Sequence, residues 1–159
     1  MRKTRGRKKM SILTGRRPTR KINSGGARKH STASALAIVP MFLHMLNSVK
    51  LYHWKTTSYS THKATDELYD SLNSKIDHFV EVMLGKDELG GRSKLLNVNV
   101  VKLDSFSIKK QVEHYKTFLL NLSNDATFSA PLNVDLLAIR DEILADLNKF
   151  LYLLGAAAP

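Results

Sequence analysis

The stretch HKATDELYDSLNSKIDHFVEVML, residues 62–84, has the apolar spacing of a helix with one buried side. At about 100° per residue, six of its side chains fall within a stripe about 100° wide. Gly85 follows directly and is expected to end the helix. The stretch therefore predicts an amphipathic helix whose buried stripe consists of Tyr69, Leu72, Ile76, Phe79, Val80 and Met83.

Beside that stripe, the same helix carries side chains that can bind a metal ion. Taking His62 as the origin, Asp66 lies at about 40°, Asp77 at about 60° and Glu81 at about 100° around the helix axis. Two carboxylates four residues apart project from one face, and imidazoles would complete a nitrogen and oxygen set that suits iron. His53 is the second candidate imidazole. The alternative is that the acids are ordinary surface residues and that His53 is a core histidine.

Three more segments have helical periodicity. Before His53, apolar residues recur from Phe42 at spacings of four, three and four, with Pro40 expected in the first turn or at a kink. Ser60 or Thr61 is the expected N-cap of the helix that follows. After a connector at 86–105 that includes the β-leaning VNVV, residues 107–123 form a third helix, and Pro131 is expected to open the fourth. The sequence therefore predicts an all-α four-helix bundle with a long crossover between helices 2 and 3.

The N-terminal segment 1–31 differs sharply from this bundle domain at 32–159. It contains no Asp or Glu, and its composition predicts a disordered basic arm. Basic blocks bind polyanions through counterion release, so nucleic acid is the favoured partner. Contacts with an assembly partner and a targeting signal are the alternatives. The basic side chains are Arg2, Lys3, Arg5, Arg7, Lys8, Lys9, Arg16, Arg17, Arg20, Lys21, Arg28 and Lys29.

Composition excludes several classes of site. The chain has no cysteine, so disulfides and thiolate metal sites are ruled out. No apolar run approaches the roughly 18 residues of a membrane-spanning helix, so no membrane partner is expected.

The series His53-Trp54, His62, Asp66, then Asp77 with Glu81, resembles the signature of the Dps proteins, the DNA-binding miniferritins of starved cells. From His62 onward the spacing matches the family, and LADLNKFLYLLGA resembles its final helix. The chain is also similar to Dps-like proteins of large DNA viruses. One spacing differs: His53 and His62 are nine residues apart, whereas the corresponding histidines of the family are usually about twelve residues apart.

The resemblance implies a ferritin-like bundle that assembles into a dodecameric cage. It implies metal sites shared between two subunits, with His53 and His62 (and Asp66 as an accessory) facing Asp77 and Glu81 of a neighbour. Ferrous iron would be oxidised there, preferably by peroxide, and stored as a mineral. We expect an iron-storing ferroxidase that protects DNA from oxidative stress. It would be cytoplasmic and nucleoid-associated, or located in a virion or viral factory if viral. The alternative is a non-enzymatic ferritin-fold protein that packages DNA.

Overall fold

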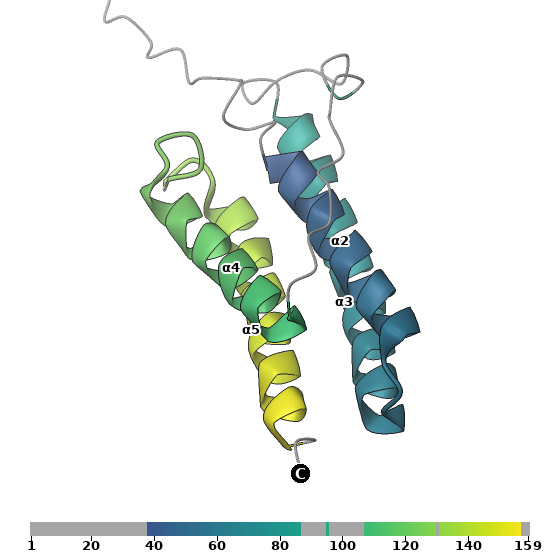
Figure 1. The fold of residues 1–159 in the computed structure, drawn as a ribbon. Helices are drawn as coiled ribbons and strands as arrows, with labels where there is room; N and C mark the ends of the chain where they lie inside the picture. Colours follow the sequence, from purple (N-terminus) through teal and green to yellow (C-terminus); the bar gives the residue numbers. More distant parts are fainter. Residues whose placement is uncertain (1–37, 87–94, 96–106, 130, 157–159) are drawn as a thin grey trace, which may run out of the picture.

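The computed structural model describes residues 38–86, 95, 107–129 and 131–156 (Figure 1). This part of the chain contains four α-helices and no strand, so the predicted all-α class is confirmed. The arm, the VNVV segment and most of the connector lie outside these residues. The elements are α2 (Ile38–Lys55), α3 (Tyr59–Gly85), α4 (Ile108–Asn121), the short 3-10 helix η3 (Leu122–Asn124) and α5 (Val134–Ala156).

The four helices form a bundle in which each helix contacts two neighbours. α2 packs on α3 and α4, and α5 packs on α3 and α4. The colours of Figure 1 show that α2 and α3 run in opposite directions, as do α4 and α5, whereas α3 and α4 run in the same direction. Within the described residues, no helix is long and apolar enough to cross a membrane.

Aromatic side chains fill the centre of the bundle. The ring of Phe79 in α3 meets Phe42 of α2 edge-on, with centroids 5.2 Å apart, and lies 6.1 Å from the ring of Phe128. Of the six apolar residues predicted to face the core from α3, four are buried and the other two, Tyr69 and Val80, are half-buried. The helical period therefore identified the buried side of α3 correctly.

Two predicted helix ends were wrong. The N-cap of α3 is Ser58, whose hydroxyl accepts a hydrogen bond from the Thr61 amide, and not Ser60 or Thr61. α5 begins at Val134 and not at Pro131, because Asn133 Nδ2 donates to the Thr127 carbonyl and holds the preceding residues in a turn.

Lys75 of α3 and Lys86, the C-cap of that helix, fix the position of α5. Lys75 Nζ lies 2.6 Å from Asp146 Oδ2, which also accepts a hydrogen bond from Ser71. At the far end, Lys86 Nζ lies 2.8 Å from Asp135 Oδ1 and lowers the pKa of that carboxyl group by hydrogen bonding. These contacts set the register of two antiparallel helices.

A buried tyrosine joins α4 to α2. The Tyr115 hydroxyl donates to Ser48 Oγ at 2.7 Å and lies 2.7 Å from Nδ1 of His44. Burial raises the pKa of Tyr115 to about 12. The network places one satisfied polar cluster inside the core, where each unpaired group would be costly.

Candidate metal centre

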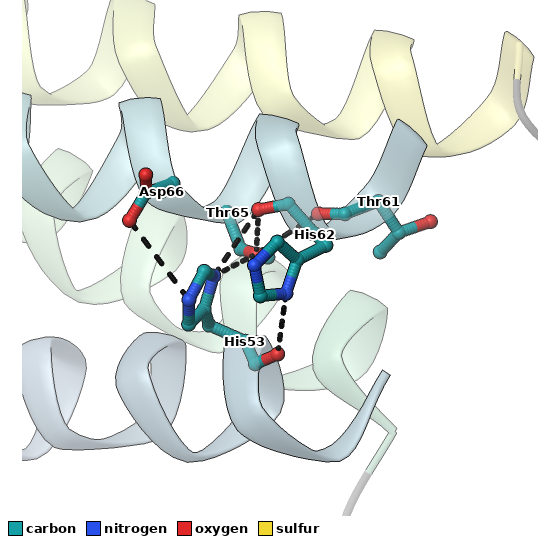
Figure 2. A network of polar contacts seen from close by, with 5 residues as sticks. All are labelled: His53, Thr61, His62, Thr65 and Asp66. Carbon is teal, nitrogen blue, oxygen red and sulfur yellow. Dashed lines mark hydrogen bonds and ion pairs between the residues drawn. The ribbon is translucent and has the colours of Figure 1, made fainter. Parts of the chain in front are cut away.

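The two candidate histidines meet where α2 ends and α3 begins. Residues 56–58 connect the helices, which brings His53 and His62 into direct contact (Figure 2). Their rings are stacked, with centroids 3.8 Å apart and planes inclined by 28°. His53 is buried and His62 is exposed, so the pair reaches from the core to the surface.

Each histidine ring is held by the backbone of the other. Nδ1 of His53 lies 3.1 Å from the carbonyl oxygen of His62, and Nδ1 of His62 lies 3.2 Å from the carbonyl oxygen of His53. A carbonyl oxygen can only accept, so both Nδ1 atoms must carry the hydrogen. The reciprocal contacts therefore fix the same tautomer in both rings.

Thr65 reinforces this assignment for His53. Its hydroxyl donates to backbone carbonyls of Thr61 and His62, both at 2.9 Å, and its oxygen lies 3.1 Å from His53 Nδ1. Because the hydroxyl hydrogen is committed to those carbonyls, Thr65 accepts from the imidazole. This leaves the Nε2 lone pairs of both rings available for a metal ion, in the arrangement usual for metal-binding histidines.

One carboxylate lies beside the buried histidine. Nε2 of His53 lies 3.9 Å from Oδ1 of Asp66, whose side chain is 45% exposed (Figure 2). Two ligand atoms bound at about 2.0–2.2 Å to one ion stand about 3–4 Å apart. The pair is therefore spaced to share an ion, with a solvent-facing side for further ligands.

A lysine and two aromatic side chains lie near the histidine pair, where α2 packs on α3. Lys50 Nζ lies 4.5 Å from the ring centroid of Tyr69 and 6.0 Å from that of Trp54. Trp54 is 68% exposed, so its indole faces solvent beside the histidine pair. The aromatic faces hold the ammonium in place by cation–π attraction.

Asp77 and Glu81 do not meet the histidines within the chain. Both are exposed residues of α3, and His62 precedes Asp77 by 15 residues, about 22 Å along the helix axis. Across the described ranges, no group of three His, Asp or Glu side chains is arranged to hold an ion by itself. The chain therefore presents an incomplete site at one end of α3 and a carboxylate pair toward the other.

The outer side of α3 has a symmetric order that the sequence reading missed. Six exposed or half-exposed polar residues recur at intervals of four, four, three, four and four, so the spacing reads the same from both ends. We call this set the α3 stripe. Its members are His62, Asp66, Asp70, Asn73, Asp77 and Glu81.

Sequence reasoning also missed Thr65. It is fully buried in a helix otherwise rich in charge, three residues after His62. A threonine inside a helix can donate its hydroxyl hydrogen to a backbone carbonyl of the preceding turn, and this is the only hint of its role that the sequence offers. Nothing in the sequence indicates that its oxygen would also reach His53.

Taken together, the described residues form an all-α bundle with a histidine pair and a carboxylate at one helix hairpin. Residues 53–154 match the model of a family of unknown function, DUF5856, and the chain belongs to that family. The matched region begins at His53 and covers the whole α3 stripe. No curated protein and no solved structure matches the chain.

Proposed function

We propose that the protein is a Dps-like ferroxidase that oxidises and sequesters iron and binds DNA through its arm. The observation that carries the proposal is that the ring of His53 stacks on that of His62 and that its Nε2 lies 3.9 Å from Asp66, while both Nδ1 atoms are held by backbone carbonyls. Nitrogen and carboxylate ligands together suit ferrous iron and retain it as ferric iron. In the reaction, two ferrous ions each give one electron, and peroxide accepts both as its O–O bond breaks.

The arrangement of the helices supports a ferritin-like bundle. α3 and α4 run in the same direction, which supports a long crossover between them. One long crossover of this kind distinguishes ferritin-like bundles from simple up-and-down ones. The long crossover and the cage are both part of this proposal.

The α3 stripe supports a site completed by a second subunit. If two α3 helices pair antiparallel about their midpoint, His62 lies opposite Glu81 of the partner subunit. Asp66 then lies opposite Asp77 of the partner subunit, and Asp70 opposite Asn73 of the partner subunit. Because a two-fold interface uses the same patch on both subunits, a stripe with symmetric spacing is what such a contact needs. Each pair of subunits would then have two equivalent metal sites, and each site would take ligands from both chains.

The test follows ferric absorbance after anaerobic addition of ferrous iron and then peroxide. The wild-type protein is compared with an Asp77→Asn, Glu81→Gln double variant. A Glu67→Gln, Glu142→Gln variant is the matched control, since it removes the same charge from exposed residues outside the stripe. Saturable oxidation lost only in the first variant is expected, and equal traces for all proteins and for buffer would falsify the ferroxidase proposal.

A second candidate is a non-enzymatic ferritin-fold protein that packages DNA. The stacked histidine rings favour it, because parallel rings 3.8 Å apart share one ion less readily than splayed ones. The arm supports DNA binding in either case. A dodecamer would display twelve such arms, and binding would then be multivalent and steeply dependent on salt. The iron assay separates the two candidates, since only the first gives saturable oxidation that depends on Asp77 and Glu81.

A further inference from the structure

Exposed aromatic side chains gather at one end of the bundle. Among the Phe, Tyr and Trp residues that the structure describes, only Trp54, Tyr59 and Tyr152 are exposed, at 68%, 79% and 75%. They lie near the end of α2, at the start of α3 and near the end of α5. These helix ends lie at the same end of the bundle, because α3 runs antiparallel to both α2 and α5 (Figure 1). Folding usually buries rings of this size, so three exposed rings at one end indicate a binding surface.

Three lysines at the same end have no carboxylate partner. Lys55, Lys63 and Lys149 are exposed, and within the described ranges none of them forms an ion pair or a side-chain hydrogen bond. Each lies within four residues of one of the exposed aromatic side chains in the sequence. Ammonium groups without a partner are free to neutralise phosphates. The surface therefore combines aromatic rings with cations that the bundle itself leaves unused.

A groove between α3 and α5 belongs to this surface. Its volume is about 480 Å³, within the range of about 300–1,000 Å³ that is typical of ligand sites. Ser60 and Leu153, the sequence neighbours of two exposed tyrosines, both line it. Leu154 adds apolar surface and Lys63 adds a cation, while Glu67 is the one carboxylate among the lining residues. The groove can therefore take a flat, partly apolar group that carries negative charge nearby.

We propose that this end of the bundle binds single-stranded nucleic acid, separately from the arm. Unpaired bases stack on Trp54, Tyr59 and Tyr152, the lysines contact the phosphates, and the groove holds one nucleotide. Aromatic platforms beside cationic side chains are how proteins bind single strands without sequence preference. The bases of a duplex are already stacked on one another, so a duplex gains little from such rings. Residues 1–31 contain no Phe, Tyr or Trp, so the arm supplies charge without stacking.

The test uses the fluorescence of Trp54, because it is the one tryptophan of the chain. The full-length protein is titrated with oligothymidylate, with an abasic oligomer that has the same number of phosphates, and with a duplex of the same length. Oligothymidylate is expected to quench the emission saturably and to bind at least about fivefold more tightly than the abasic oligomer. The duplex is expected to bind through charge and to leave the emission unchanged.

Variants separate stacking from charge. Tyr59→Ala and Tyr152→Ala should each weaken the binding of oligothymidylate by about fivefold or more and leave duplex binding unchanged. Leu120→Ala, which removes an exposed apolar side chain of α4, is the matched control and should bind like wild type.

Several outcomes overturn the proposal. Equal affinity for oligothymidylate and the abasic oligomer would show that charge alone is recognised. Unchanged affinity in both tyrosine variants, or no quenching by oligothymidylate, would remove the stacking surface. Emission that changes with protein concentration alone, and not with oligothymidylate, would assign the surface to contacts between copies of the chain. None of these measurements involves a metal ion, so they are independent of the ferroxidase proposal.

Discussion

The imidazole of His53 is stacked on that of His62, and each ring donates through Nδ1 to the carbonyl oxygen of the other residue. The two histidines thereby hold one another in place, and Thr65 provides a further acceptor for His53 Nδ1. Their Nε2 atoms keep the lone pairs that a metal ion needs. A site of this kind is preorganised before any ion arrives.

Thr65→Val should weaken metal binding without unfolding the protein. The substitution removes the hydroxyl that accepts from His53 Nδ1, while the His62 carbonyl remains as an acceptor. Loss of a residue that orients a ligand typically costs about 10- to 100-fold in affinity, and we expect the lower end. Titration with Co²⁺ followed by visible absorbance measures it. Thr117→Val, on the exposed side of α4, is the control and should bind like wild type.

Co²⁺ should stabilise the wild-type protein against thermal unfolding, and His53→Asn should abolish the effect. A ligand at about 100 times its Kd adds about 2.7 kcal/mol when it binds only the folded state. Differential scanning fluorimetry with and without Co²⁺ gives the shift in Tm. His114→Asn changes an exposed histidine of α4 and should leave the shift intact. An equal shift in all three proteins would place the ion elsewhere.

Tyr115 should make the protein less stable as the pH rises from 10 to 12. The unfolded chain releases this proton near pH 10, whereas the folded chain holds it until about pH 12. In that window the folded state binds more protons, so stability falls by up to about 2–3 kcal/mol as pH increases. Urea unfolding of wild type and Tyr115→Phe across this range isolates the contribution. Parallel curves for the two proteins would contradict it.

Asp146→Asn should cost about 1 kcal/mol of unfolding free energy. The carboxylate accepts hydrogen bonds from both Ser71 and Lys75 in a half-buried position between α3 and α5. Hydrogen bonds to charged groups contribute more to stability than neutral ones. The loss is limited because water still hydrates the lysine ammonium in the variant. Urea denaturation measures the loss. A double-mutant cycle that combines Asp146→Asn with Lys75→Met gives the interaction energy of this ion pair. Glu142→Gln, at an exposed position of the same helix, should change stability by less than about 0.5 kcal/mol.

The helices and their buried sides followed from the sequence because hydrophobic periodicity reports burial directly. Leu72, Ile76 and Met83 recur at helical spacing, and all three are buried. Helix ends were less predictable, since several hydroxyls near Ser58 could cap α3 and tertiary hydrogen bonds of Asn133 decide where α5 begins. Local propensity does not contain those tertiary contacts.

The metal-binding candidates of the site were predictable from the sequence, but Thr65 and the geometry of the site were not. Spacing alone placed His62, Asp66, Asp77 and Glu81 on one side of a helix, where they lie. The contact of His53 with His62 depends on how sharply residues 56–58 turn, which the sequence does not specify. The core pair of Tyr115 with Ser48 joins positions 67 residues apart and has no local signal.

The short hairpin between α2 and α3 has a consequence for the order of folding. Contacts between residues nine positions apart in sequence close only a small loop, so they lose little chain entropy and form quickly. The pairing of α3 with α5, by contrast, joins residues 71 positions apart. The histidine pair can therefore assemble while the rest of the bundle is still open, and an ion captured at that stage would act as a template for the remaining helices.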